Sequence, residues 1–430
     1  MEVLLNFRRY LLDNGLRVLI LEDRTLPIVS FQVHFAAGSR YELPGITGIS
    51  HLFEHMMFRG TSKLGPEEFS KIIQARGGVV NAFTTFDHTT YWENIPSKEL
   101  ELVIELEAHR LKELRITEEN LATELEVVRS ERKMRIANTP YGAALEELFS
   151  LAYLRHPYRW PVIGWDQDLR RLTVKDCLEY FRRRYAPSRA VIVVAGDVNP
   201  ERTLKLIEQN YADLPASDEE KDFIEIEPPQ RGERTAVFKK RVELGAFFWA
   251  FHVPGIESED VYALLLLAYI LSVGKTSRFW KRFVKNGSLT ELKAQVDPPP
   301  FWPKDPALFI IYGIASPKVP LAEVEEEVWK ELNSLKDTLS DDEVKKAQKL
   351  YLSSLWDQLE SLFFRALLGG IYEVKTGDFR KAWEIEEKIK RTEKEDITRV
   401  LERYFQKDNR TRLIVEPITV EEEEKFGLIE

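Results

Sequence analysis

The sequence lacks cysteine pairs, a basic excess and long apolar runs, and each absence excludes a class of protein. Cys177 is the only cysteine in 430 residues, so neither an intrachain disulfide framework nor a cysteine zinc cluster can form. The formal net charge of −10 argues against general nucleic-acid binding, because no basic excess is present to displace phosphate counterions. The longest apolar run, residues 261–271, is too short to span a bilayer and predicts a buried helix.

The N-terminal segment, residues 1–12, has neither the apolar stretch nor the small-residue cleavage site of a secretory signal peptide. We therefore expect a cytoplasmic protein that contacts no membrane and no nucleic acid. The hydrophobic content of 44% is ordinary for a soluble globular protein. A chain of 430 residues is too long for one ordinary hydrophobic core, which predicts at least two domains.

Two segments of equal length, residues 173–185 and 392–404, share one sequence pattern. Each begins with threonine, carries a carboxylate three residues later and ends in Arg-Tyr. An apolar stretch follows each of them, at residues 190–195 and 411–415. This pattern predicts an N-capped helix that leads into a buried strand. A repeat in two copies of this length indicates a domain duplication.

The beginnings of the two halves also correspond. Residues 16–21 and 29–35 predict two paired strands around a proline-containing turn, and residues 235–241 and 245–252 take the same place in the second half. Between the halves, the acidic stretch 216–232 is punctuated by proline and glycine, which predicts an exposed linker.

We therefore expect a first domain at residues 1–215, a linker at 216–232 and a second, homologous domain at 233–430. Because each half mixes strands with long helices, the expected fold class is α+β. Each domain should be a mostly antiparallel sheet packed against helices.

The segment from His51 to His55 concentrates the chemistry of the chain. It has the pattern H-x-x-E-H, with Glu54 between the two histidines, and it inverts the H-E-x-x-H order of many zinc peptidases. Residues three and four apart share one face of a helix, so both imidazoles and the carboxylate should point the same way. The two histidines can then hold one metal ion.

A catalytic zinc ion usually has three protein ligands, so a third ligand is needed. The segment 117–135 is the best candidate to supply it, as a helix with Thr117 at its N-cap. Glu124 and Glu131 are two turns apart and share one face of this helix. Two carboxylates on an apolar-flanked stripe are unusual unless something cationic faces them.

These residues resemble the inverted-zincin peptidases, which include pitrilysin, insulin-degrading enzyme and the mitochondrial processing peptidase. The resemblance implies that His51, His55 and Glu131 bind Zn²⁺ and that Glu54 activates the attacking water. It implies a supporting role for Glu124, outside the ring of metal ligands. The first domain would then be the catalytic one and the second domain non-catalytic.

The resemblance extends over most of the chain. The stretch Asn81, Ala82, Phe83 and Thr84 is similar to the family's substrate-binding edge strand, so these residues are expected to bind an extended peptide. Further matches lie at residues 156–158, 196–198 and 276–278, and at Gly164. The other histidines are scattered, which favours structural roles, with His88 alone beside the expected edge strand: His34, His88, His109, His156 and His252.

One stretch departs from the family pattern. Family members carry an arginine, and a tyrosine seven residues later, in a catalytically silent half, where the pair contacts substrate near the zinc. Val284 and Glu291 stand at these positions here, and neither side chain can do that work. We therefore expect this chain to be the zinc subunit of a heterodimer whose homologous partner supplies the Arg/Tyr pair. The alternatives are a homodimeric peptidase and a catalytically weak peptide-binding or assembly subunit.

Overall fold

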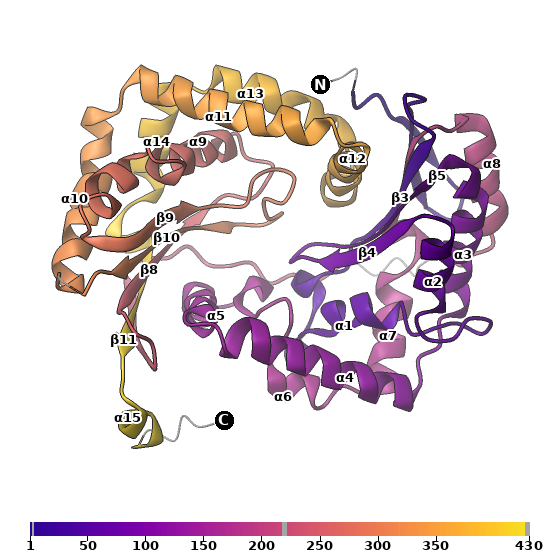
Figure 1. The fold of residues 1–430 in the computed structure, drawn as a ribbon, viewed down its shortest axis with the longest axis horizontal. Helices are drawn as coiled ribbons and strands as arrows, with labels where there is room; N and C mark the ends of the chain where they lie inside the picture. The colour runs from indigo at the N-terminus through magenta and orange to yellow at the C-terminus, as the bar shows by residue number, and fades with distance from the viewer. Residues whose placement is uncertain (2–3, 217–221, 318, 426–430) are drawn as a thin grey trace. The chain divides into compact units, whose positions relative to one another are not determined.

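The computed structural model describes residues 1, 4–216, 222–317 and 319–425 (Figure 1). The chain forms two compact units, and neither is one continuous stretch of sequence. The first consists of Met1–Lys133, Trp160–Glu225 and Trp356–Ile385, and the second of Met134–Arg159, Ile226–Leu355 and Glu386–Glu430. Part of the expected linker, residues 217–221, lies outside the described residues. Among the residues that are described, no helix is both long and apolar enough to cross a membrane.

The first unit is built on a six-stranded sheet with the strand order β1-β2-β6-β3-β5-β4. Only β2 and β6 run parallel, and all other neighbours are antiparallel. The strands in this order are β1 (Arg8–Leu11), β2 (Arg17–Glu22), β6 (Ala190–Gly196), β3 (Ile28–Phe35), β5 (Thr89–Pro96) and β4 (Val79–Thr84).

The second unit repeats this plan with five strands in the order β7-β11-β8-β10-β9. Here β7 and β11 are the parallel pair, as β2 and β6 are in the first unit. The strands are β7 (Arg234–Lys240), β11 (Arg410–Pro417), β8 (Ala246–Val253), β10 (Ala307–Ala315) and β9 (Leu289–Gln295). The prediction of an α+β chain with two homologous, mostly antiparallel sheets is confirmed.

The expected pairing within each half was wrong in one respect. The first two long strands of each half do not pair with each other, because the last strand of the repeat lies between them: β6 separates β2 from β3, and β11 separates β7 from β8. The second repeat helix also begins one residue later than expected. Its cap is Glu393, which shares a capping box with Asp396, while the hydroxyl of Thr392 donates to the carbonyl of Lys388.

Helices cover both faces of the first sheet (Figure 1). Glu93 of β5 lies on the face toward α3, and Gln32 of β3 lies on the opposite face, where its amide donates to the Phe363 carbonyl of α12 at 3.0 Å. The helices of this unit are α1 (Ile49–Met56), α2 (Glu68–Ala75), α3 (Leu100–Glu113), α4 (Glu118–Arg132), α6 (Asp166–Leu169), α7 (Val174–Arg184), α8 (Pro200–Tyr211) and α12 (Leu362–Thr376).

In the second unit, α5 packs on β11, β8 and β7, and α9 is buried around nearly its whole circumference, as its apolar sequence predicts. The remaining helices are α5 (Gly142–Ala152), α9 (Asp260–Ser272), α10 (Leu321–Thr338), α11 (Asp341–Leu359), α13 (Ile385–Arg391), α14 (Lys394–Tyr404) and α15 (Val420–Lys425). The end of α11 and the start of α13 belong to the first unit.

Each half of the sequence therefore gives one helix to the unit built mainly from the other half. All residues of β6 are buried, so both of its faces need cover, and α12 covers one of them. In the same way α5, from the first half, packs on the sheet of the second unit. For this reason the compact units do not coincide with the contiguous halves 1–215 and 233–430 that the repeat suggested.

Candidate metal centre

Helix α1 carries the H-x-x-E-H segment, and its N-terminus is capped by Glu42, a residue outside the helix. Its N-cap residue, Gly48, has a φ of 86° and no side chain to accept a hydrogen bond. The carboxylate of Glu42 replaces that missing acceptor, since its two oxygens accept from the N–H groups of Gly48 at 2.9 Å and Ser50 at 2.8 Å. Burial raises the pKa of Glu42 to about 7, while the bonds to Ser50 and Gly48 oppose the rise.

The apolar face of α1 anchors the helix in the core of the first unit. Leu52, Phe53 and Met56 are fully buried on this face. The Tyr91 hydroxyl of β5 donates to the carbonyl of Phe53 at 3.0 Å, which fixes the helix against the sheet. The opposite face is left to His51, Glu54 and His55.

Helix α4 provides the facing carboxylates. Thr117 caps it by accepting from the Asn120 N–H, as the sequence predicted. Glu124 and Val128 are buried toward α1, and Glu131 follows one turn later on the same stripe. The helical period thus aims both predicted carboxylates at the histidine helix.

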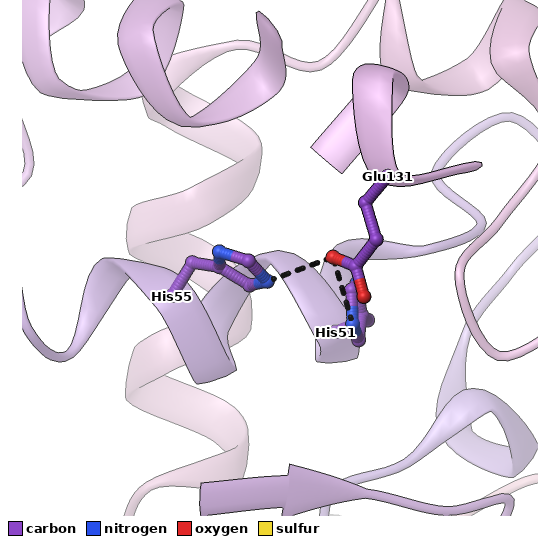
Figure 2. A group of neighbouring side chains, drawn as sticks. All are labelled: His51, His55 and Glu131. Atoms are coloured by element: carbon purple, nitrogen blue, oxygen red, sulfur yellow. Dashed lines mark ion pairs between the residues drawn. The ribbon is translucent and has the colours of Figure 1, made fainter. Parts of the chain in front are cut away.

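Figure 2 shows the carboxylate of Glu131 between the two imidazoles. Its Oε2 lies 3.3 Å from His55 Nε2 and 3.8 Å from His51 Nε2. One potential ligand atom from each of the three residues lies within 4.8 Å of the other two. Two atoms bound to one tetrahedral zinc ion at about 2.0–2.1 Å are about 3.3–3.4 Å apart. The donor types and their spacing therefore fit a zinc ion.

Glu124 contacts the Nδ1 side of the His55 ring, opposite the Nε2 atom that faces Glu131. Its Oε2 lies 3.2 Å from His55 Nδ1, and its Oε1 is paired with the Arg59 guanidinium. A carboxylate that accepts from Nδ1–H leaves Nε2 as the lone-pair donor, the arrangement typical of metal-binding histidines. Burial lowers the pKa of His55, but the hydrogen bond and charge of Glu124, with the charges of Glu54 and Glu131, outweigh it and raise that pKa.

Glu54 is tied to the edge strand of the sheet. The Thr84 hydroxyl, at the end of β4, donates to Glu54 Oε2 at 2.7 Å. Strand β4 ends the sheet and pairs with β5 on one side. Because Thr85 N–H donates to the His88 carbonyl, alternation turns the backbone N–H and C=O of Ala82 and Thr84 away from β5.

The Asn81 side chain covers one of these outward groups. Its Oδ1 accepts from the Ala82 N–H at 2.8 Å, so the amide occupies a donor of the open edge. The four residues expected to bind substrate thus lie on an edge strand that meets the metal centre at Thr84. His88 lies beyond that strand and is fully buried, which excludes it from contact with substrate in this conformation.

The sequence was compared with those of known proteins. The family profile described as insulinase (peptidase family M16) matches residues 17–164, and the profile described as peptidase M16 inactive domain matches residues 171–351. The zinc protease PqqE of Helicobacter pylori is 30% identical over 416 residues, covering 94% of this chain and 92% of that protein. The chain belongs to the M16 peptidase family. Its zincin motif is of the inverted type.

Other relatives agree with this assignment. The uncharacterized zinc protease YmxG of Bacillus subtilis is 25% identical and covers 95% of this chain and 98% of its own length. The crystal structure of a protease from Helicobacter pylori superposes with a TM-score of 0.90 at 29% identity, covering 96% of this chain and 99% of that one. A structure of a peptidase M16 inactive domain from Pseudomonas fluorescens, at 17% identity and a TM-score of 0.84, has the same fold.

The two departing positions lie in the second unit. Val284 ends a short π-helical turn, Trp280–Val284, and Glu291 lies on β9. The Tyr312 hydroxyl of the neighbouring strand β10 donates to Glu291 Oε1 at 3.0 Å. Burial raises the pKa of Tyr312 to about 12, and the bond to Glu291 adds to the rise.

Sequence reasoning missed two residues that position the site. Arg59 lies in the turn just after α1, and its guanidinium pairs with Glu124. Glu42 precedes α1 by several residues, and only the glycine at the helix N-cap hinted that a cap had to come from elsewhere. Both residues act through backbone or carboxylate partners, so neither forms a motif by itself.

Proposed function

We propose that this chain is a zinc-dependent endopeptidase that cleaves short or unfolded peptides. The observation that carries the proposal is the approach of His51, His55 and Glu131 within 4.8 Å, with Glu54 on the histidine helix. The zinc-protease names of the Helicobacter and Bacillus relatives support it. The open edge of β4 supports it as well, because an extended peptide can add a strand there.

Each side chain has a task in this reaction. His51, His55 and Glu131 would hold the metal ion, which would supply the Lewis acidity that makes water a nucleophile near neutral pH. Glu54 accepts the proton of the attacking water and gives it to the leaving amine, acting first as base and then as acid. Glu124 is a positioning residue, since it acts through the His55 ring.

The substrate strand and the base are aligned by one hydrogen bond. The Thr84 hydroxyl holds Glu54 Oε2, so the carboxylate is oriented before a peptide arrives. A peptide that pairs with β4 bonds to the outward N–H and C=O of Thr84 and to the outward C=O of Ala82, since Asn81 already takes the Ala82 N–H, and this places its main chain beside Glu54. Backbone pairing demands an extended segment and little particular sequence, which favours short or unfolded substrates.

The test is hydrolysis of a mixed fluorogenic peptide library by the purified chain, alone and together with a homologous subunit, with the zinc content measured on the same samples. The informative variant is Glu54→Gln, and the matched control is Glu126→Gln, which changes an exposed carboxylate of α4. We expect Glu54→Gln to lose hydrolysis while it retains zinc, and the control to remain active. Hydrolysis that survives in Glu54→Gln would contradict the assigned base, and a chain that binds no zinc would contradict the proposal.

We further propose that the active form pairs this chain with a homologous subunit that supplies an Arg/Tyr pair. The support is that Val284 and Glu291, at the corresponding positions, offer no hydrogen-bond donor to a developing oxyanion. A homodimeric peptidase is the competing assembly, and a peptide-binding or assembly subunit is the competing function. Hydrolysis only after addition of a homologous chain supports the heterodimer. Hydrolysis by this chain alone supports the homodimer. Peptide binding without hydrolysis, both with and without the added chain, supports the peptide-binding or assembly subunit.

We also propose that the protein is located in the cytoplasm. One structure of similar fold, at 17% identity, is described as the periplasmic protease PqqL from Escherichia coli, and this chain covers 48% of it. Fractionation of the native cells, with detection of the full-length chain, distinguishes the two compartments.

A further inference from the structure

Two hydroxyls of the β4–β5 hairpin hold helix α1 at consecutive residues. The Thr84 hydroxyl donates to Glu54 Oε2 at 2.7 Å. The Tyr91 hydroxyl donates to the carbonyl of Phe53, the residue before it, at 3.0 Å. Thr84 pairs with Thr89 across the two strands, and Tyr91 follows Thr89 by two residues, so all three side chains share the face toward α1. The proposed base and the backbone beside it are therefore both fixed from the sheet.

Thr89 stands behind the first of these hydroxyls. Because Thr84 gives its one proton to Glu54, its oxygen can only accept a further hydrogen bond. Thr89 Oγ1 lies 3.3 Å from that oxygen and 2.9 Å from the Ala37 carbonyl, so its proton is shared between two acceptors. A Thr84 oxygen that accepts from Thr89 directs its own proton toward the carboxylate. Thr89 thus favours the one orientation of the Thr84 hydroxyl that holds Glu54.

Tyr185, the C-cap residue of α7, stands behind the second hydroxyl. The Tyr91 proton goes to the Phe53 carbonyl, so in the 2.9 Å contact between the two phenols it is Tyr185 that donates. Burial raises the pKa of both phenols well above the ordinary value of 10.0, so both keep their protons near neutral pH. A hydrogen bond with Thr89 opposes the rise at Tyr185, which connects the tyrosine pair with the threonine pair.

The core encloses this group of hydroxyls. Thr89 and Tyr91 are fully buried, and Tyr185 is 3% exposed. The centre of the Tyr185 ring lies 4.6 Å from that of Phe35 and 5.3 Å from that of Phe53. Hydrogen bonds in such an environment of low dielectric constant strengthen and polarise one another. Loss of one hydroxyl therefore weakens the bonds of its neighbours as well as its own.

We propose that Thr89 and Tyr185 are positioning residues for the general base. Thr89 acts on the Glu54 carboxylate through Thr84, and Tyr185 acts on the backbone of α1 through Tyr91. The proposal deepens the peptidase function and rests on it. A reacting group that is displaced by about 1 Å can lose about a hundredfold in rate, so the orientation of the carboxylate matters. Because Thr89 and Tyr185 are buried, their loss should lower kcat and leave KM unchanged.

The first arm of the test measures kcat, KM and zinc affinity, with the homologous subunit present if hydrolysis requires it. Thr89→Val removes the hydroxyl and keeps the shape of the side chain. We expect kcat to fall about three- to tenfold, the usual effect of one hydrogen bond, with KM and zinc affinity unchanged. Thr89→Ser should restore kcat. The matched control is Thr90→Val, since Thr90 is equally buried on the same strand and its hydroxyl bonds to His34 on the other face.

Tyr185→Phe tests the tyrosine pair in the same way. We expect kcat to fall about three- to tenfold, again with KM and zinc affinity unchanged. The control is Tyr211→Phe, because the Tyr211 hydroxyl is buried and has no partner among the described residues. This comparison also decides the proposal if Thr89→Val fails to fold.

The second arm asks whether Thr89 acts through Thr84. Thr84→Val removes a bond to a charged group and should lower kcat about 10–100-fold. Adding Thr89→Val to it should then cost nothing further in kcat, since the route to Glu54 is already broken. Melting temperatures of the same variants need no hydrolysis, and the double variant should lose less than the sum of the two single losses. For Thr84→Val combined with Thr90→Val the losses should add.

The outcomes separate the positioning role from the proposed function. A kcat of Thr89→Val equal to that of Thr90→Val, or an equal loss with and without the Thr84 hydroxyl, overturns the positioning role. Absence of hydrolysis by the wild type with every peptide, with and without a homologous subunit, overturns the proposed function and with it any role in catalysis. Melting temperatures that add for Thr84 and Thr89 would show, independently of activity, that the two hydroxyls are not coupled.

Discussion

A buried charge cluster in the first unit gives the sharpest quantitative prediction. Glu93 of β5 faces Glu107 and Arg110 of α3, and all three are buried. The Arg110 guanidinium lies against the rings of Phe58, Phe69 and Tyr91, between 4.4 and 5.1 Å from their centres. Two buried carboxylates thus share one buried cation.

Burial raises the pKa of Glu93 well above its ordinary value of 4.5, and the charge of Glu107 raises it further, while Arg110 opposes the rise. The folded protein therefore keeps a proton that the unfolded chain loses. The contribution of Glu93 to stability is fully present below about pH 4.5 and is lost as the pH rises toward the folded-state pKa. The loss is about 1.4 kcal/mol for each unit of pH in that interval.

Glu93→Gln removes this loss, because an amide carries no titratable proton. We expect the melting temperature of the variant to rise relative to the wild type as the pH is raised from 5.5. For a domain of about 150–250 residues, a loss of about 1.4 kcal/mol per pH unit corresponds to a melting-temperature difference of about 3–5 °C per pH unit. Differential scanning calorimetry of both proteins across this pH range measures it. Glu105→Gln, an exposed carboxylate on the same helix, is the control and should show no such trend.

A temperature difference between variant and wild type that does not change with pH would refute the reasoning. It would mean that Glu93 is ionised in the fold and that Arg110 neutralises it together with Glu107. A variant that melts lower than the wild type at pH 7.5 would point the same way, because the lost charge would then have been stabilising.

Three further changes test other contacts. Lys375→Met leaves Asp87, 2% exposed and 3.3 Å from the lysine, without this cation and should cost about 3–5 kcal/mol in chemical denaturation; a loss below about 1 kcal/mol contradicts this. Glu124→Gln weakens the hold on the His55 ring and should lower zinc affinity about tenfold or more in a chelator competition; unchanged affinity contradicts the positioning role. Glu42→Ala leaves two N–H groups at the start of α1 without their acceptor and should lower the unfolding free energy in chemical denaturation by about 2–4 kcal/mol; an unchanged free energy contradicts the capping role.

The grouping of the candidate metal ligands could be predicted because most of its geometry is local. His51, Glu54 and His55 lie within two turns of one helix, so the helical period alone puts them on one face. Glu124 and Glu131 share a face of α4 for the same reason, and Thr117 marked where that helix begins. No local pattern predicts that α4 packs on α1. The expectation that Glu131 joins the two histidines came from the family resemblance.

The order of the strands in each sheet could not be predicted from local sequence patterns. Residues 16–21 and 29–35 are close in sequence and both apolar, so direct pairing was the natural expectation. The energetics favour β6 between them, because a strand with every residue buried is better placed in the middle of a sheet than at its edge. That choice depends on the burial of a strand about 160 residues later in the chain. Arg59 and Glu42 escaped prediction in the same way, since the partner of each is set by tertiary packing.

The exchange of helices gives the second half of the sequence a part in the unit that carries the candidate metal centre, although none of the candidate metal ligands lies in that half. Helix α12 approaches the first sheet closely, and a Cβ on Gly370 would lie 2.1 Å from the His34 ring. From the same helix, Lys375 pairs with Asp87 in the turn that follows β4. The turn at the end of the expected substrate strand is therefore held from two sides, by α1 through Glu54 and Thr84 and by α12 through Asp87. A half that looks catalytically silent in sequence thus fixes the position of the strand on which the substrate is proposed to lie.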